Sequence, residues 1–282
     1  MGNGWRFEFA SSTNEDLINV GSFEYRISLV TLWKSVIKTA IITGGSRGIG
    51  RAIVDRFLSD KWHVVSCSRR ECPDDLQGRV VWVQADVSSA SDTDKVVSCA
   101  IDHFGVIDAL VNNAGVQVEK TLEDSSDEDW DQVIGVNCRG VFNMCRAVLK
   151  HISHGGSIIN IGSISGHVSD PSMALYNASK AFVHGLTRSI AVDHGAKVRC
   201  NAICPGWTMT EMAEDGFALA DDPEAAMQDA LARHPVGRFG QPMDIANMAA
   251  WLVSDQAQYV SGQMFTVDGG LTAASPISPG LF

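Results

Sequence analysis

Residues 39–58 read TAIITGGSRGIGRAIVDRFL and decide the fold of this chain. Residues 39–43 form an apolar run typical of a buried strand, a glycine-rich segment follows at 44–50, and residues 51–58 have the apolar spacing of an amphipathic helix. Glycines let the backbone turn tightly and approach a pyrophosphate, whose charge the amides at a helix N-terminus stabilise. This order of strand, glycine loop and helix predicts a dinucleotide-binding site.

The same alternation continues along the chain. Apolar runs that predict strands lie at 39–43, 63–68, 80–85, 109–112, 157–162, 198–203 and 264–267, and helical patterns lie near 49–60, 92–104, 127–151, 174–193 and 242–253. Strands too apolar to face water, separated by helices, indicate an α/β fold in which helices cover both faces of a parallel sheet. Such a sheet binds its ligand at the carboxyl ends of its strands.

Ser163, Tyr176 and Lys180 have the side chains that proton transfer to a carbonyl oxygen requires. The pattern of 174–193 places Tyr176 and Lys180 at i and i+4 on one helix face, a spacing that also arises by chance. A phenol has an unperturbed pKa of about 10, and we expect the ammonium of Lys180 to lower it. Ser163 ends the apolar run 158–162, so we expect it at the carboxyl end of a strand.

The end of the second predicted strand bears on the choice of dinucleotide. NAD sites usually place an acidic residue there for the ribose 2′-hydroxyl, whereas NADP sites offer cations to the 2′-phosphate. Here the strand ends in Ser68 and Arg69 without a carboxylate, and Arg47 lies in the glycine loop. We therefore expect NADP(H) to be favoured over NAD(H). The alternative is that these arginines are solvated surface residues, and Glu71 lies just beyond them.

A series of short motifs, in order from about residue 39 to 271, resembles the short-chain dehydrogenase/reductase family. The motifs are the glycine loop Thr43–Gly50, Asp86-Val87, Asn112-Asn113-Ala114-Gly115, Asn137, the set Ser163, Tyr176 and Lys180, Pro205-Gly206 with Thr208 and Thr210, Gly237–Pro242 and Val267–Gly270. The resemblance implies a Rossmann-type, doubly wound parallel sheet of about seven strands in three α/β/α layers.

The resemblance also implies an NAD(P)(H)-dependent oxidoreductase that interconverts a carbonyl and a secondary alcohol by hydride transfer. It implies that Tyr176 exchanges the proton, Ser163 holds the carbonyl oxygen, Lys180 lowers the Tyr176 pKa and binds the ribose, and Asn137 holds a water that feeds protons to Lys180. The implied cofactor-binding residues are Gly44, Ser46, Arg47, Gly48, Ile49, Gly50, Ser68, Arg69, Asp86, Val87, Asn113, Ala114, Gly115, Tyr176, Lys180, Pro205, Gly206, Thr208 and Thr210.

Composition limits the class of protein. The chain has 282 residues, 45% hydrophobic and 20% charged, which is ordinary for a protein with one large core. It has no apolar run of the roughly eighteen residues that a membrane helix needs, and no secretory signal. A formal charge of −11 argues against a nucleic-acid partner. The seven cysteines form no tight pairs, so we expect reduced core thiols, no metal site and a cytoplasmic location.

Residues 1–37 lack the alternating pattern and are treated as an N-terminal extension of unknown structure, whereas residues 38–282 predict a single dinucleotide-binding catalytic domain. We expect a substrate lid at about 207–235, and His167 near the catalytic serine. The family usually forms tetramers, so we expect a homotetramer paired through the helices near 127–151 and 174–193, and a tail, 271–282, that reaches a neighbouring subunit's pocket. The apolar lid residues are Trp207, Met209, Met212, Phe217 and Met227.

Two other functions remain open. One is an NAD-linked sugar or polyol dehydrogenase. The other is a dinucleotide-sensing scaffold without catalysis, which should lack Ser163, Tyr176 or Lys180, although this chain keeps all three. The partner that we expect is a small-molecule carbonyl or alcohol substrate, with small ketones, sugars or polyols, β-ketoacyl thioesters and steroids all open.

Overall fold

The computed structural model describes residues 17–20, 23–26 and 37–274. The chain divides into two units, residues 1–37 and 38–282. In the first unit, Leu17–Val20 (β1) and Phe23–Arg26 (β2) form an antiparallel pair with Leu17 opposite Arg26. The rest of the expected N-terminal extension and residues 275–282 of the tail lie outside the described residues.

The second unit is built on a seven-stranded sheet with the strand order β5-β4-β3-β6-β7-β8-β9. Every neighbouring pair in it is parallel, which confirms the predicted doubly wound α/β fold. Its strands are Thr39–Thr43 (β3), His63–Ser68 (β4), Val81–Gln84 (β5), Ile107–Asn112 (β6), Ile152–Ile161 (β7), Val198–Pro205 (β8) and Met264–Val267 (β9).

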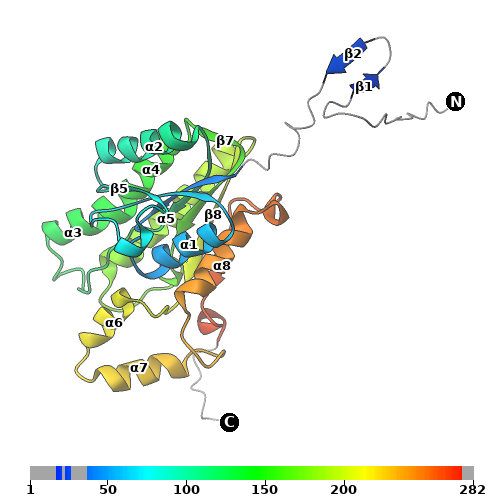
Figure 1. Ribbon diagram of the computed structural model, residues 1–282. Helices are drawn as coiled ribbons and strands as arrows, with labels where there is room; N and C mark the ends of the chain where they lie inside the picture. The colour runs from blue at the N-terminus through cyan, green and yellow to red at the C-terminus, as the bar shows by residue number, and fades with distance from the viewer. Residues whose placement is uncertain (1–16, 21–22, 27–36, 275–282) are drawn as a thin grey trace. The chain divides into compact units, whose positions relative to one another are not determined.

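Helices cover both faces of this sheet (Figure 1). The helices α1 and α8 pack together on one face, and α2, α4 and α5 lie on the other, while α6 and α7 follow the carboxyl end of β8. The bounds are Gly48–Ser59 (α1), Ala90–Phe104 (α2), Asp127–Ile134 (α3), Val141–Val148 (α4), Ala174–His194 (α5), Glu211–Ala218 (α6), Pro223–Ala232 (α7) and Pro242–Val253 (α8).

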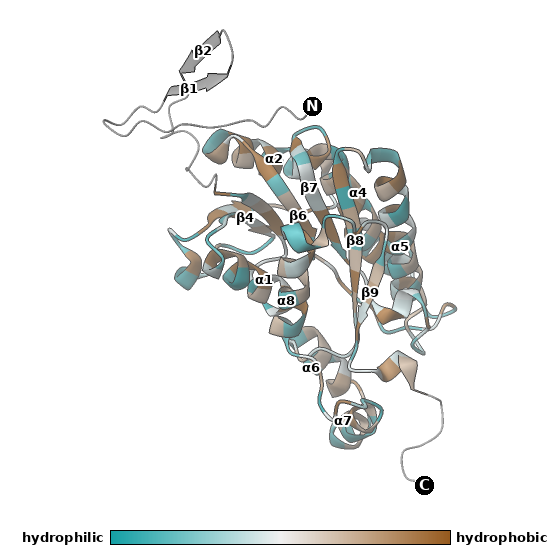
Figure 2. Ribbon diagram, turned by 90° about the vertical axis from the view of Figure 1, so that its right-hand side faces the viewer, coloured by the Kyte–Doolittle hydropathy of each residue, from teal (hydrophilic) through white to brown (hydrophobic). Residues whose placement is uncertain are grey.

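The strands are apolar along their length because both of their faces are buried. Ile41 packs into the core beneath α2 and α4, whereas the next residue, Ile42, packs into the core beneath α1 and α8. The pair Ile158 and Ile159 in β7 divides in the same way, and all four side chains are fully buried. Figure 2 shows this apolar colouring along the sheet, between helices that carry polar residues on their outer sides.

The prediction of a single helix near 127–151 is wrong in one respect. The helix is broken into α3, a π-helical segment Gly135–Gly140, and α4. Each π-type turn holds one extra residue, and such bulges are frequent at functional sites. Here the bulge turns Asn137 inward, where its side chain is buried.

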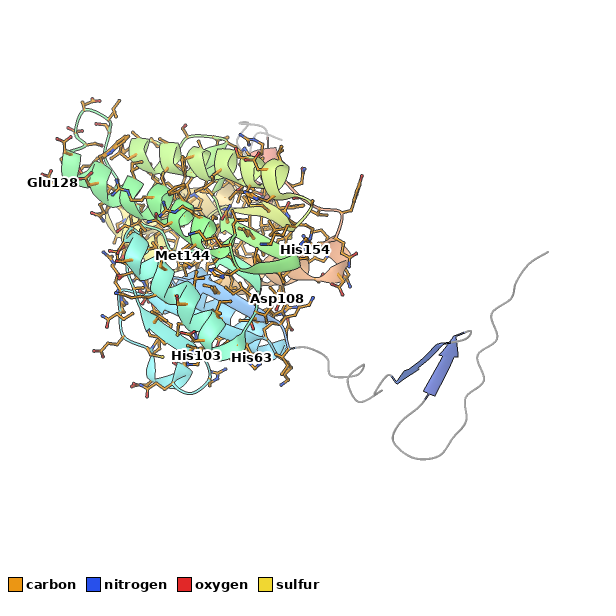
Figure 3. The ribbon with its side chains drawn as sticks, turned by 90° about the horizontal axis from the view of Figure 1, so that it is seen from above. His63, His103, Asp108, Glu128, Met144 and His154 are labelled. Carbon is orange, nitrogen blue, oxygen red and sulfur yellow. The ribbon has the colours of Figure 1, made fainter. Side chains whose placement is uncertain are left out.

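The amino-terminal edge of the sheet is closed by polar bonds around Asp108 of β6, which Figure 3 labels at that edge. Its carboxylate accepts hydrogen bonds from the Thr39 amide and from the Ser153 hydroxyl, each at 2.8 Å. These bonds join the starts of β3, β6 and β7. In the part of the chain that the structure describes, no helix has the length and apolar character needed to cross a membrane.

Candidate active site

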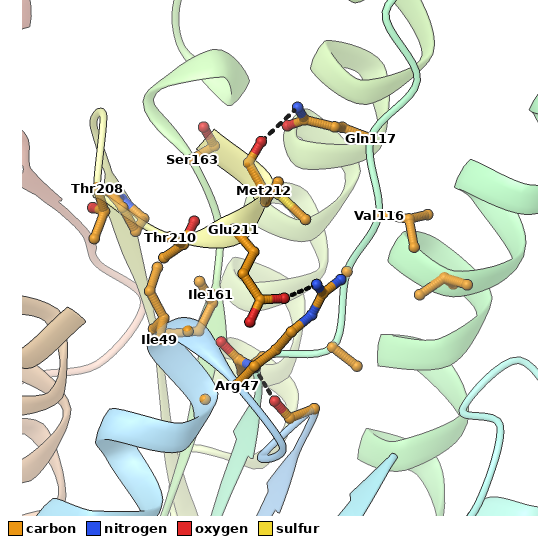
Figure 4. Close-up of a pocket in the computed structure, with 18 of the residues that line it drawn as sticks. Arg47, Ile49, Val116, Gln117, Ile161, Ser163, Thr208, Thr210, Glu211 and Met212 are labelled. Carbon is orange, nitrogen blue, oxygen red and sulfur yellow. Dashed lines mark hydrogen bonds and ion pairs between the residues drawn. The ribbon is translucent and has the colours of Figure 1, made fainter. Parts of the chain in front are cut away.

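A cavity of about 340 Å³ lies at the carboxyl ends of the central strands (Figure 4). Every residue that the motif resemblance implied for cofactor binding lines it, from Gly44 in the glycine loop to Thr210 before α6. Ser163, Tyr176 and Lys180 line it as well. Asn137 is the one expected catalytic residue that is not in the lining. Residues far apart in the sequence therefore share one site.

The floor of the cavity is fixed by a clasp between the ends of β3 and β6. The Thr43 hydroxyl accepts hydrogen bonds from the amides of Asn113 and Ala114, both at 3.0 Å. In return, the Asn113 side chain donates to the carbonyls of Thr43 and Gly44, at 3.0 and 3.1 Å. From β3 the strand order continues to β4 and β5 on one side of the sheet, and β6 begins the other side. The clasp between β3 and β6 therefore lies where the strand order reverses.

The glycine loop passes so close to this clasp that side chains are excluded. A Cβ on Gly50 would lie 2.3 Å from the Gly44 carbonyl oxygen and 2.2 Å from the Asn113 side chain. Gly44 itself has a φ of +70°, in the left-handed region that favours glycine. The glycines leave bare backbone on this wall, beside the lining residues Ser46, Arg47 and Ile49.

The opposite wall carries Tyr176 and Lys180 on α5. Burial raises the pKa of Tyr176 to about 12, against a smaller lowering by a hydrogen bond from Ser163 and a further rise from the charge of Asp170. Burial also lowers the pKa of Lys180 to about 8. Lys180 is not among the groups that shift the pKa of Tyr176, so the expected lowering of the phenol pKa is not found in this structure. The Lys180 amine lies 5.4 Å from the centre of the Tyr176 ring and donates to the Ile161 carbonyl at 2.9 Å.

Ser163 follows β7 as expected, and it belongs to a chain of hydroxyls that the sequence analysis missed. Its hydroxyl donates to the Ser165 hydroxyl at 3.0 Å, and Ser165 donates to the Asp170 carboxylate at 2.6 Å. Both partners line the cavity. No motif marks them, and their only sequence signal is their position within seven residues of Ser163.

Asn137 supports the site from behind. Its side chain accepts the Val116 amide at 2.9 Å and donates to the Val116 carbonyl at 2.8 Å and to the Ser179 hydroxyl at 3.0 Å. The π-helical segment thus links the chain after β6 to α5. Gly115 lies between Asn137 and Lys180. A Cβ there would be 3.4 Å from the side-chain oxygen of Asn137 and 3.7 Å from the Lys180 amine.

The two arginines expected to read the 2′-phosphate have different surroundings. The main chain of Arg69 is held by Gln84, whose side chain donates to the Arg69 carbonyl at 2.9 Å, and its side chain lines the cavity. Arg47 instead forms an ion pair with Glu211 of α6, across the cavity mouth (Figure 4). Both members of that pair are about half exposed, so the pair contributes little to stability.

The segment after β8 folds over the cavity with only part of its apolar side chains facing inward. Trp207 and Met212 line the cavity, whereas Phe217 stacks on Trp207 with ring centroids 4.7 Å apart. Met209 and Met227, also expected in a lid, do not line it. Thr210, one of the implied cofactor-binding residues, lines the cavity and also caps α6 by accepting the Ala213 amide at 3.3 Å.

His167 does not line the cavity, although it lies four residues after Ser163. Its ring packs on His184 with centroids 4.4 Å apart. It therefore lies on the far side of the serine from the cavity, a placement that sequence proximity alone did not reveal.

Comparisons with known proteins agree on the class. A family model described as enoyl-(acyl carrier protein) reductase matches residues 44–272. Glucose 1-dehydrogenase 2 of Bacillus subtilis is 37% identical over 83% of this chain and 95% of its own length, and the NADP-dependent (R)-specific alcohol dehydrogenase of Lentilactobacillus kefiri is 36% identical over 84% and 97%. The ligand-free aldohexose dehydrogenase of Thermoplasma acidophilum superposes with a TM-score of 0.82 at 31% identity, covering 86% of this chain and 96% of that one.

These matches fall within the second unit, residues 38–282, and fit the fold and the cavity described above. The chain belongs to the short-chain dehydrogenase/reductase family. It is an oxidoreductase of the class that acts on CH–OH groups.

Proposed function

We propose that this protein is an NAD(P)(H)-dependent enzyme that interconverts a carbonyl and a secondary alcohol, with Asn137, Ser163, Tyr176 and Lys180 as its catalytic set. The observation that supports this most is the shared cavity, where a phenol, a serine hydroxyl and a lysine amine face a wall of bare glycine backbone. We propose residues 38–282 as the catalytic domain and about 207–235 as its substrate lid.

The cavity fits a dinucleotide on the chemistry of its walls. The close approach at Gly44 and Gly50 leaves backbone amides free to meet a pyrophosphate, and Asp86 and Val87 line the adjoining part of the cavity. When bound, a nicotinamide cofactor supplies or accepts the hydride at the carbonyl carbon. The residues around it then have to orient the substrate and move the proton.

Tyr176, Ser163 and Lys180 account for the transfer of the proton to the carbonyl oxygen. Because burial raises the pKa of Tyr176 to about 12, the phenol keeps its proton at neutral pH and can donate it to a carbonyl oxygen. Ser163 stabilises that oxygen by a hydrogen bond as negative charge develops on it. Lys180 supplies positive charge 5.4 Å from the centre of the Tyr176 ring and is placed to bind ribose hydroxyls.

Replacing Tyr176 tests this assignment. Tyr176→Phe keeps the ring and removes only the transferable proton, so we expect turnover to fall by at least about 100-fold, the usual range for a lost general acid. Cofactor affinity, measured by fluorescence titration, should stay within about twofold of the parent. Lys180→Ala should reduce both. Substantial turnover by Tyr176→Phe would contradict the mechanism, and a parent protein that binds cofactor without turning over any substrate would favour the sensing scaffold.

The pKa of Lys180 predicts the pH dependence of carbonyl reduction. Its folded-state value of about 8 lies below the usual one, so the ammonium is charged below pH 8 and neutral above it. We expect kcat/KM for reduction to be level near neutrality and to fall as pH rises through about 8, while Tyr176 remains protonated. A profile that stays level to about pH 10, the ordinary lysine range, would refute this role.

We propose NADP(H) as the favoured cofactor because Arg69 lines the cavity at the end of β4. A guanidinium meets a 2′-phosphate bidentately, and charge-assisted hydrogen bonds are worth roughly 1.5–3 kcal/mol each. Arg69→Ala should therefore weaken NADPH binding by at least about tenfold and leave NADH nearly unchanged. Arg233→Ala on the exposed end of α7 is the matched control.

The ion pair between Arg47 and Glu211 provides a second variant for the same cofactor-binding experiment. Glu211 competes for the Arg47 guanidinium, so Glu211→Gln should strengthen NADPH binding relative to NADH. A parent protein that prefers NADH, or equal weakening of both cofactors by Arg69→Ala, would show that Arg69 does not read the phosphate.

A specific observation favours the alternative of a sugar or polyol substrate. Asp170 and Gln117 place hydrogen-bonding groups in the cavity beside the catalytic residues. Hydroxyl-rich substrates use such groups, and relatives named for glucose and aldohexose share the fold. A panel of aldoses, polyols and simple ketones separates the two. Asp170→Asn should reduce turnover of the polyols more than that of simple ketones if Asp170 binds a substrate hydroxyl.

We also propose a cytoplasmic homotetramer, in line with seven free cysteines. Phe142 on α4 and Phe182 on α5 are each 43% exposed, which suits helices that pair between subunits. Light scattering at micromolar concentration should give a tetramer, and Phe182→Glu should dissociate it, whereas Tyr259→Glu at a fully exposed site should not. A monomeric parent would contradict this. A tail, 271–282, that reaches a neighbour's pocket is part of the same proposal.

A further inference from the structure

We infer that His167, His184 and Cys204 form a binding site for a soft divalent metal ion of the zinc type, directly behind the catalytic serine. One imidazole nitrogen from each histidine and the Cys204 sulfur all lie within 4.8 Å of one another. Two imidazoles and a thiolate are a ligand set that Zn²⁺ prefers. No metal site was expected from the sequence because the seven cysteines form no tight pairs, and these three residues are 17 and 20 positions apart.

The spacing of the three groups suits tetrahedral coordination. The Cys204 sulfur and the Nε2 atom of His184 are 3.1 Å apart. Nitrogen and sulfur ligands at ordinary bond lengths to Zn²⁺ lie roughly 3.3–3.6 Å from one another, so this pair opens by about half an ångström. A pair near the 4.8 Å limit of the cluster closes by about an ångström. His167 is exposed and provides access for the ion, and a water completes the fourth position.

The slot that holds His184 is built for that ring. A Cβ on Gly166 would lie 2.3 Å from the imidazole, and one on Gly162 would lie 2.6 Å from its Nε2 atom. The Nδ1 atom of the same ring is buried and has no hydrogen-bond partner among the described residues. The ring therefore occupies a position that packing permits only between two glycines, with a polar atom left unsatisfied.

Metal binding at this site releases a proton. When the ion binds, the sulfur–hydrogen bond of Cys204 is replaced by a sulfur–metal bond and the proton passes to water.

The site is joined to the catalytic serine by the main chain, and this part of the inference rests on the proposed function. Gly162, the residue before Ser163, packs so close to Cys204 that a Cβ there would lie 3.2 Å from the sulfur. His167 follows the short helical turn Ile164–Gly166 that begins after Ser163. An ion bound to both residues therefore holds the segment 163–167 at its two ends. We infer that occupancy displaces Ser163 and lowers turnover.

Metal binding is tested without reference to activity. The full-length protein, stripped with a chelator, is titrated with Co²⁺, which reports tetrahedral coordination and thiolate ligation through its visible and near-ultraviolet absorption. We expect one equivalent with both signatures, displaced by Zn²⁺. The exposed substitution His167→Gln should weaken Zn²⁺ binding by at least about tenfold, and Cys204→Ser should remove the thiolate band.

A second pair in the chain provides the matched control. Cys99 and His103, one turn apart on α2, bring a sulfur and a ring nitrogen to 3.6 Å with no third ligand. Cys99→Ser should leave the Co²⁺ spectrum unchanged. No binding by the parent protein, or a spectrum that is lost in Cys99→Ser and retained in His167→Gln, would overturn the site.

The catalytic consequence has its own readout. We expect one equivalent of Zn²⁺ to lower kcat of the parent at least about threefold without changing cofactor affinity, since small displacements of catalytic groups cost rate. His167→Gln should keep the metal-free rate and lose the inhibition. Bound metal with unchanged kcat would overturn the coupling to Ser163, whereas a protein that binds the ion but turns over no substrate would show that the proposed function has failed and the site has not.

Discussion

The clasp between Thr43 and Asn113 is the interaction on which the rest of this site depends. It joins the ends of β3 and β6, the two strands from which the connections run to opposite sides of the sheet. The Asn113 side chain also donates to the Gly44 carbonyl, and this bond holds the glycine loop against the strand ends. The cavity, the start of α1 and the position of Gly50 all follow from that contact.

The two walls of the cavity contrast in chemistry. One is the glycine loop, whose bare backbone stands beside Arg47 and Ile49, and the other is a cluster of titratable groups whose pKa values burial has shifted. The shifts keep the Tyr176 phenol protonated at neutral pH and lower the pKa of Lys180 to about 8. Perturbed pKa values of this kind gather at functional sites. In the proposed mechanism, the main chain of the glycine loop binds the ligand and the side chains on the other wall transfer the proton.

Much of this was predictable from local patterns. The strands around Ile41 and Ile158 are apolar on both faces, so periodicity alone indicated a covered parallel sheet. Motif spacing likewise placed the glycine loop and Tyr176 on one cavity. The break at Asn137 was not predictable, because a π-type turn depends on what its extra residue meets, here Val116 and Ser179.

Contacts between distant segments could not be predicted from the sequence either. Arg47 pairs with Glu211, 164 positions later, and nothing in either local sequence indicates it. The Lys180 ammonium donates to the Ile161 carbonyl, and burial of Tyr176, which the sequence did not indicate, raises the pKa of the phenol. The placement of His184 between Gly162 and Gly166 depends on three elements meeting. Such features arise from tertiary packing, which periodicity and motif spacing do not encode.

The most direct test of the central claim follows the hydrogen atoms. A ketone is reduced by the parent protein with nicotinamide cofactor deuterated at its transferable position, and separately in D₂O with unlabelled cofactor. Hydride transfer with a proton from Tyr176 predicts one deuterium at the carbinol carbon in the first case and none there in the second. Deuterium from the solvent at that carbon, or a product without label from the cofactor, would contradict the account.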